Sequence, residues 1–340
     1  MACIFAALGC GGRAAHQCIS GSSGTCGDIQ SDPKNCGACG HDCLGGACSA
    51  GTCQPFVLAS AQAEPLGIAV DSTGVYWTDY DGGTVMNMGG CDDSPTQLAS
   101  GQGFPRSIVV DATRMYWANS GGDRDGTIMS CAKGHCSSTS VELASRQDSP
   151  FAIAVDSTSV YWTNSGDFTV MKCAIVGCGH SPTQLASGQR YLEGIAVDNT
   201  SVYWTTDSAI VKCTVGGCGN SPTQLAVGQK LPVGITVDAT NVYWTNWDDG
   251  TVMKCATDGC GSGPTLLASA QSPVGIAVDA TTVYWTNEGS GTVMKCAING
   301  CGNAPTQLAS GEDTPASIVV DATSVYWTRY GDGRVMRLVK

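Results

Sequence analysis

From residue 55 to the C-terminus, apolar and polar positions repeat in units of about 40 residues. One unit starts at Pro232 and reads Pro-Val-Gly-Ile-Thr-Val-Asp, then Val-Tyr-Trp-Thr, then Thr-Val-Met-Lys-Cys, and finally Thr-Leu-Leu-Ala. The first run is continuously apolar, as in a strand buried on both faces, and the third alternates. Turn sequences such as Asp-Ala-Thr and Asp-Asp-Gly separate the runs. The unit therefore predicts four short strands, at residues 234–237, 242–245, 251–255 and 265–268.

The second predicted strand of every unit carries a Tyr-Trp pair, and the chain contains seven such pairs. Four strands per unit, repeated seven times, predict an all-β fold: a seven-bladed β-propeller of four-stranded blades. A helical solenoid would need apolar residues every three to four positions, and the units lack that period. The pairs are Tyr76-Trp77, Tyr116-Trp117, Tyr161-Trp162, Tyr203-Trp204, Tyr243-Trp244, Tyr284-Trp285 and Tyr326-Trp327.

The last unit stops at Lys340, directly after its third predicted strand. The missing fourth strand stands before the first unit, where residues 55–60 share the Pro-x-x-Leu-Ala-Ser pattern of residues 182–187. We therefore expect the N-terminal strand to complete the seventh blade. Such closure removes the unpaired strand edges that invite aggregation.

The Tyr-Trp-Thr-Asp sequence at residues 76–79 resembles the class B repeats of low-density-lipoprotein-receptor propellers. The resemblance runs through all seven units and implies the same packing of strands. Those receptor propellers have six blades, however, so their partners do not carry over. The Asp is also retained only at Asp79, and the other units have Asn119, Asn164, Thr206, Asn246, Asn287 and Arg329.

Ahead of the repeats, residues 13–53 contain seven cysteines and few aliphatic residues, so this segment needs covalent staples in place of a core. Its sequence Asn-Cys-Gly-Ala-Cys-Gly-His-Asp-Cys, at residues 35–43, resembles the core of Stig1-type cysteine-rich modules, which implies a small extracellular disulfide module. A zinc half-site at Cys36-x-x-Cys39 is the alternative. The predicted organisation is a leader at 1–12, the module at 13–53 and the propeller at 54–340.

Residues 1–12 are apolar and then small, ending around Cys10. This pattern is typical of the end of a bacterial lipoprotein signal peptide and predicts lipidation of Cys10, although the segment lacks a basic stretch. An ordinary apolar tail is the alternative. The chain has 20 cysteines, a number that favours an oxidising compartment. We therefore expect an extracytoplasmic protein, either a cell-envelope lipoprotein or a secreted one.

Five units contain two cysteines separated by four residues, between the third and fourth predicted strands. A Gly-rich turn lets each pair approach to disulfide distance. The first unit keeps only Cys91, and a bridge from the N-terminal module to Cys91 would make the cysteine count even. The predicted disulfides are Cys131–Cys136, Cys173–Cys178, Cys213–Cys218, Cys255–Cys260 and Cys296–Cys301.

The formal net charge of −12 argues against nucleic acid as a partner and against a membrane contact other than a lipid anchor. No cofactor is predicted, although the negative charge permits cationic ligands, including Ca²⁺ at the acidic loops. In a propeller, the loops between strands 2 and 3 and those between strands 4 and 1 share one face. Sequence variety is concentrated there, with acidic and aromatic residues interleaved.

These loops predict a ligand face for a protein or a glycan, with carboxylates for charge and aromatic rings as anchors. The alternative is that Asp and Gly merely form solvated turns. The 2–3 loop candidates are Tyr80, Asp81, Asp123, Asp125, Asp167, Trp247, Asp248, Asp249, Glu288, Tyr330 and Asp332. The 4–1 loops add Phe104, Arg106, Arg190, Tyr191 and Glu193. An aspartate that recurs in every unit is instead expected to cap a turn: Asp71, Asp111, Asp156, Asp198, Asp238, Asp279 and Asp321.

The sequence carries no Ser-His-Asp set, no HExxH motif and no phosphate-binding Gly loop. Its four histidines, His16, His41, His135 and His180, all fall outside the expected ligand face. An exported binding or scaffold propeller is therefore the favoured function. The alternatives are a lyase or hydrolase with a metal in the central channel, and a structural envelope protein without a specific ligand.

Overall fold

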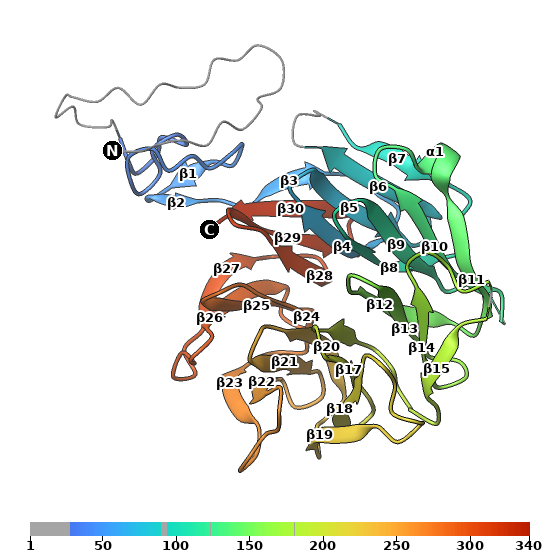
Figure 1. Ribbon diagram of the computed structural model, residues 1–340. Helices are drawn as coiled ribbons and strands as arrows, with labels where there is room; N and C mark the ends of the chain where they lie inside the picture. Colours follow the sequence, from blue (N-terminus) through green and yellow to red (C-terminus); the bar gives the residue numbers. More distant parts are fainter. Residues whose placement is uncertain (1–27, 90–93, 123, 180) are drawn as a thin grey trace, which may run out of the picture.

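The computed structural model describes residues 28–89, 94–122, 124–179 and 181–340, and these form a ring of seven four-stranded antiparallel sheets (Figure 1). The predicted all-β propeller is therefore confirmed. The two strands of the N-terminal region and the strand that follows it lie beside the C-terminal end of the ring (Figure 1). In the part of the chain described, no helix is long and apolar enough to cross a membrane.

The strands follow the repeat. The N-terminal region has β1 (Cys48–Ser49) and β2 (Thr52–Cys53). Blade 1 has β4 (Pro65–Asp71), β5 (Gly74–Asp79), β6 (Thr84–Gly89) and β7 (Thr96–Ala99); blade 2 has β8 (Pro105–Val110), β9 (Arg114–Asn119), β10 (Gly126–Ala132), the short helix α1 (Cys136–Thr139) and β11 (Val141–Gln147); blade 3 has β12 (Pro150–Val155), β13 (Ser159–Asn164), β14 (Thr169–Ala174) and β15 (Thr183–Ala186). Blade 4 has β16 (Ile195–Val197), β17 (Ser201–Thr205), β18 (Ala209–Thr214) and β19 (Thr223–Val227); blade 5 has β20 (Pro232–Val237), β21 (Asn241–Asn246), β22 (Thr251–Ala256) and β23 (Thr265–Ser269). Blade 6 has β24 (Pro273–Val278), β25 (Thr282–Asn287), β26 (Thr292–Ala297) and β27 (Thr306–Ser310), and blade 7 has β28 (Pro315–Val320), β29 (Ser324–Arg329), β30 (Arg334–Val339) and β3 (Phe56–Ala59).

The ring closes as predicted, because the N-terminal β3 pairs antiparallel with the C-terminal β30. Phe56 lies opposite Arg337, and Val57 lies opposite Met336. Two strands almost three hundred residues apart in sequence thus complete one sheet, and blade 7 has the same four strands as its neighbours.

The Tyr-Trp pairs form the core between blades. The seven tryptophans of these pairs are all fully buried. In six blades the indole N–H donates to a Gln or Glu side chain at the start of the 4–1 loop that leads into the same blade. In blade 5, Trp244 Nε1 donates to Gln229 Oε1 at 2.9 Å, and Asn246 Nδ2 donates to the same oxygen at 3.0 Å. Since Gln229 follows the last strand of blade 4, these bonds join neighbouring blades.

Threonines after the tryptophans make a second contact between blades. Thr245 Oγ1 accepts from Gly234 N at 2.9 Å and donates to the carbonyl of Val274 in the next blade, also at 2.9 Å. A Cβ atom at Gly234 would lie 2.2 Å from that carbonyl oxygen, so glycine at this position lets the inner strands of blades 5 and 6 approach this closely.

The recurring aspartates cap turns, as predicted. Asp111 Oδ1 accepts from the backbone N–H groups of Thr113 and Arg114, and its Oδ2 accepts from the Tyr116 hydroxyl at 2.8 Å. Burial acts to raise the pKa of Asp111, but these hydrogen bonds outweigh it and the pKa is lowered. Five other blades repeat the Tyr–Asp bond, and in blade 1 the hydroxyl of Tyr76 bonds Thr73 instead.

All five predicted blade disulfides are present between the third and fourth strands. In the N-terminal module, Cys36 pairs with Cys48, Cys43 pairs with Cys53, and Cys39 is also disulfide-bonded. The zinc half-site at Cys36 and Cys39 is therefore wrong, because both sulfurs are already in disulfides. This many disulfides indicates an oxidising, extracytoplasmic location. The predictions for Cys10 and Cys91 lie outside the described residues.

Blade 6 lacks one of the bonds between blades. Ala270 stands where the other blades have Gln or Glu, and among the described side chains Trp285 Nε1 is a buried donor without a partner. We expect Ala270→Gln to supply the acceptor and to raise the free energy of unfolding by about 1 kcal/mol. Urea denaturation followed by tryptophan fluorescence would measure this. The mirror change Gln229→Ala in blade 5 should lower stability, and destabilisation by Ala270→Gln would contradict the assignment.

Candidate functional site

The 4–1 loops share one backbone shape. Each places a residue with a left-handed φ of 49° to 60° before the first strand, and in every blade but blade 4 this residue directly precedes the strand: Glu64, Phe104, Ser149, Tyr191, Leu231, Ser272 and Thr314. Glycine would adopt this conformation with less strain, yet none of the seven is glycine. In six blades the residue's carbonyl accepts a backbone N–H from the 2–3 loop, as in Tyr80 N to Glu64 O at 3.0 Å. The loops are thus coupled, and each side chain is held on the face they share.

The residue two positions after this left-handed residue belongs, in each blade, to a ring of side chains around the central channel. We call this ring the mouth ring. It is made of Leu66, Arg106, Phe151, Glu193, Val233, Val274 and Ala316, and these residues line a cavity of about 320 Å³. The position after it is always small, Gly, Ala or Ser, and the following position is Ile in all seven blades. Packing therefore dictates the deeper rings. The mouth ring differs from blade to blade, and packing does not require those differences.

One side of the mouth ring is charged and aromatic. The guanidinium carbon of Arg106 lies 5.0 Å from the ring centroid of Tyr80 and 4.5 Å from that of Phe151, and the rings of Tyr80 and Phe104 are 5.3 Å apart. Burial raises the pKa of Glu193, and the positive charge of Arg106 counteracts this in part. The opposite side, with Leu66, Val233, Val274 and Ala316, is aliphatic.

Beside the mouth ring lies a smaller cavity of about 250 Å³, which we call the tyrosine cup. It is lined by Tyr80, Tyr330, Glu288, Leu66 and Arg106 among others. The Tyr330 hydroxyl donates to Glu64 Oε2 at 2.7 Å, and this bond raises the pKa of Tyr330 to about 12. The bond fixes the Tyr330 ring. The cup thus combines two aromatic rings, an aliphatic wall and the exposed carboxylate of Glu288.

The structure brings together three of the residues predicted from the 2–3 loops, Tyr80, Glu288 and Tyr330. Three predicted aspartates instead serve their own turns: Asp167 accepts from Thr169, Asp249 accepts from Thr251, and Asp332 holds Arg329 with both oxygens. The remaining candidates, Asp81, Asp125, Trp247 and Asp248, are exposed on separate loops. The prediction for Asp123 lies outside the described residues.

Metal-binding groups do not converge at this face within the described ranges. The only set of three candidate ligand atoms found close together there is Cys36, Cys43 and Cys53, and these sulfurs form disulfides. Of the described histidines, His41 bonds the carbonyls of Cys36 and Lys340, and His135 lies in the turn before α1. Both lie outside the segments that carry the mouth ring, His41 in the N-terminal region and His135 between β10 and β11. His16 and His180 lie outside the described residues.

Sequence reasoning named Arg106 and Glu193 but missed Phe151 and the aliphatic half of the mouth ring. A signal was available: when the units are compared with one another, the residue two before the invariant isoleucine is the one that varies. The loop sequences alone do not reveal this ring, because six of its members are the second residues of the first strands and Glu193 lies just before β16.

No protein-family profile matches the chain, and no curated protein matches it in sequence. Its fold is similar to that of virginiamycin B lyase from Staphylococcus aureus, with a TM-score of 0.68 and 15% identity over 84% of this chain and 98% of the lyase. A streptogramin B lyase gives a TM-score of 0.70 with 14% identity over 84% of this chain and 96% of that one. A chain of a nidogen/laminin complex gives 0.53 with 19% identity over 67% of this chain and 89% of that one. These likenesses establish the propeller fold and no more.

Proposed function

We propose that this protein is an exported binding propeller that recognises basic side chains of a protein partner at the mouth ring and tyrosine cup. The observation that carries the proposal is the mouth ring itself. The seven blades are closely similar but differ at the mouth-ring position, where packing does not dictate the residue. These differences give the ring one charged and aromatic side and one aliphatic side. Recognition of a specific ligand requires side chains that differ around the ring, and the symmetric scaffold carries such a set here.

The chemistry of the cup favours a cationic head on a long aliphatic stem, as in lysine or arginine. Aromatic faces attract cations, and Leu66 and Val274 offer apolar surface to the stem. Arg106 is already held between Tyr80 and Phe151, close to Glu193. Within the described residues Glu288 has no ion-pair partner, so its carboxylate is open to a ligand. The strongly negative net charge would speed the approach of such a ligand.

Peptide binding tests the proposal. The full chain, with disulfides intact, would be titrated into fluorescein-labelled peptides that carry lysine and arginine, or glutamate at the same positions. We expect the basic peptide to bind with a Kd below about 100 µM at low salt and to weaken as salt screens the charges. The glutamate peptide should not bind. Equal binding of both peptides, or of neither, would overturn the proposal.

A pair of double variants locates the site. Glu288→Gln with Tyr330→Ala removes one carboxylate and one ring from the cup, and we expect at least a tenfold rise in Kd, about 1.4 kcal/mol. The matched control, Asp248→Asn with Trp247→Ala, removes the same kinds of group from the 2–3 loop of blade 5. It should leave Kd unchanged. If only the control weakens binding, the ligand sits on the outer acidic loops, and a glycan that competes with the peptide would extend the ligand class.

The similarity to streptogramin and virginiamycin lyases supports a second candidate, an enzyme of the central channel. One of the similar structures is a catalytically inactive lyase, with a histidine replaced by alanine, in complex with quinupristin. Neither described histidine of this chain stands in the mouth ring, which weighs against the same chemistry. Incubating the protein with quinupristin and following it by mass spectrometry decides the matter, because conversion of quinupristin would require the lyase assignment.

A further inference from the structure

Blade 4 departs from the other blades in its 2–3 hairpin. The stretch from Trp204 to Cys213 is two residues shorter than the stretch from Trp244 to Cys255 in blade 5. As a result, β17 ends at Thr205 and β18 starts already at Ala209. The first strand of this blade, β16, is also the shortest of the seven.

The deletion is accompanied by the loss of a large side chain. Six blades place a methionine opposite the buried tryptophan in the strand register, as Met253 lies opposite Trp244. In blade 4 the residue opposite Trp204 is Val211. A shorter loop and a smaller side chain on the same side of the sheet leave space between blades 3 and 4.

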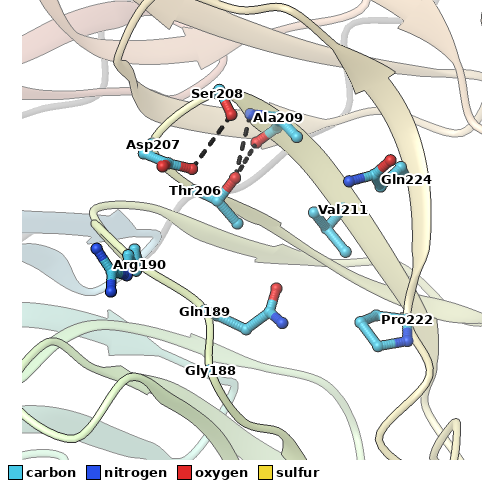
Figure 2. Close-up of a pocket in the computed structure, with 10 residues that line it drawn as sticks. All are labelled: Gly188, Gln189, Arg190, Thr206, Asp207, Ser208, Ala209, Val211, Pro222 and Gln224. Atoms are coloured by element: carbon cyan, nitrogen blue, oxygen red, sulfur yellow. Dashed lines mark hydrogen bonds between the residues drawn. The ribbon is translucent and has the colours of Figure 1, made fainter.

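That space is a cavity of about 530 Å³, which we call the blade-4 slot (Figure 2). Ligand pockets commonly have volumes of about 300–1,000 Å³. Val211, Pro222 and Gln224 line it from β18 and the start of β19, and Gln189 projects toward them from the 4–1 loop (Figure 2). Arg190 and Asp207 lie on the other side of the space (Figure 2).

The deletion also frees hydrogen-bonding capacity inside the slot. In blade 5, Gln229 Oε1 accepts from both Trp244 and Asn246. Blade 4 has Thr206 in place of that asparagine, and its hydroxyl bonds Ala209 within its own hairpin. Among the described residues, Gln189 Oε1 therefore accepts a hydrogen bond from Trp204 alone, at 3.3 Å. The corresponding amide oxygen accepts two hydrogen bonds in blades 2, 3 and 5, so the oxygen of Gln189 has spare capacity to accept.

The groups around the slot are polar, and their charges balance. They comprise the amides of Gln189 and Gln224, the hydroxyls of Thr206 and Ser208, one guanidinium and one carboxylate. Among the residues the structure describes, no ion pair engages the guanidinium of Arg190. Ala209, Val211 and Pro222 add a small apolar floor. The lining contains no aromatic ring of the kind that anchors a peptide.

We infer that the blade-4 slot binds a sugar unit of a polysaccharide. A pyranose presents hydroxyls that both donate and accept, which suits paired amides and hydroxyls, and it presents C–H groups that suit the apolar floor. Its neutral or singly acidic character fits a slot with one cation and one carboxylate. The slot would therefore act independently of the mouth ring, so one propeller could hold a protein and a glycan together.

Saturation-transfer NMR and calorimetry on the full chain would test this with defined probes: maltotriose, cellotriose, chitotriose and trigalacturonate. We expect at least one to bind with a Kd below about 1 mM. Binding of trigalacturonate alone would assign Arg190 to a sugar carboxylate. Binding of none of the four, or binding only of the basic peptide used above, would overturn the inference.

Two variants place the binding in the slot without disturbing the fold. Val211→Met restores the side chain that six blades carry at this position, so the blade should fold normally while its slot is filled. We expect the affinity for sugar to fall at least tenfold. Met253→Val is the mirror change in blade 5 and should leave sugar binding unchanged. If Val211→Met binds sugar as the unaltered protein does, the site lies elsewhere and the inference is wrong. Peptide binding at the cup should survive both changes, which separates the two proposals.

Discussion

Removal of residues 1–60 should lower the free energy of unfolding by about 4–6 kcal/mol and cause the protein to self-associate. This deletion takes away β3, whose Ala59 is buried with Trp77, Tyr326 and Val335 between blades 7 and 1. Losing the buried Ala59 and the half-buried Phe56 and Leu58, together with the backbone pairing to β30, accounts for about 4 kcal/mol. The deletion also leaves β30 as an unpaired edge, which is a template for pairing with another chain. Urea denaturation and light scattering after size exclusion would measure both effects.

The control deletion stops at residue 54 and keeps β3. It removes the cysteine-rich module and its contacts with blade 7, such as the bond from His41 Nε2 to the carbonyl of Lys340. We expect less than half the loss of stability and no self-association. Equal losses from the two deletions would mean that the module, and not the strand, closes the ring.

The substitution Asp79→Asn should stabilise the protein by about 2–3 kcal/mol above pH 7 and have little effect near pH 4. Asp79 is the single aspartate at a position where four other blades have asparagine. Its side chain is 4% exposed, its Oδ2 accepts from Thr84, and among the described side chains its Oδ1 has no partner. Burial raises the pKa of Asp79 from 3.8 to about 6. A shift of that size corresponds to about 3 kcal/mol.

The sign of the pH dependence follows from where the proton resides. Between pH 4 and pH 6 the folded chain keeps the Asp79 proton that the unfolded chain has lost, so stability falls as pH rises through this window. Above this window the charged carboxylate is buried at its full cost. An amide avoids that cost and can donate to the neighbouring Gln and Thr side chains, as Asn246 does in blade 5. Thermal unfolding at several pH values would check this. The converse change Asn119→Asp in blade 2 should introduce the same penalty, and an unchanged profile in Asp79→Asn would refute the assignment.

The fold could be predicted well from the sequence because every blade repeats the same structural determinants. Every blade buries the same Tyr-Trp pair, caps its turn with the same aspartate and, in five blades, closes its outer turn with the same cysteine spacing. The strand and turn pattern of one repeat would be a weak indication of the fold, but its recurrence in seven repeats makes the prediction strong. The split seventh blade could also be predicted, because the missing strand at Lys340 and the extra strand at residues 55–60 share a pattern.

The candidate site was harder to predict, for a physical reason. Acidic 2–3 loops looked like ligand-binding loops, but Asp167 and Asp249 accept bonds from threonines two residues away, as turn aspartates often do. Recognition chemistry lies instead where residues from different blades meet, as Arg106 meets Tyr80 and Phe151. Such meetings depend on the shape of the closed ring, which no single repeat encodes.

The cysteine-rich module lies beside the outer edge of blade 7. Leu338 of β30 lies opposite Val325, the register position that Cys296 has opposite Val283 in blade 6. Where five other blades turn through a short disulfide loop, blade 7 has Lys340 and the neighbouring module, and Cys43 and Cys53 share a buried cluster with Leu338. The closed ring of seven similar blades therefore does not require the chain to start in blade 1. Joining residue 340 to residue 54 and opening another outer turn would yield a circularly permuted protein with the same seven blades, in which the module could be attached at a different point around the rim.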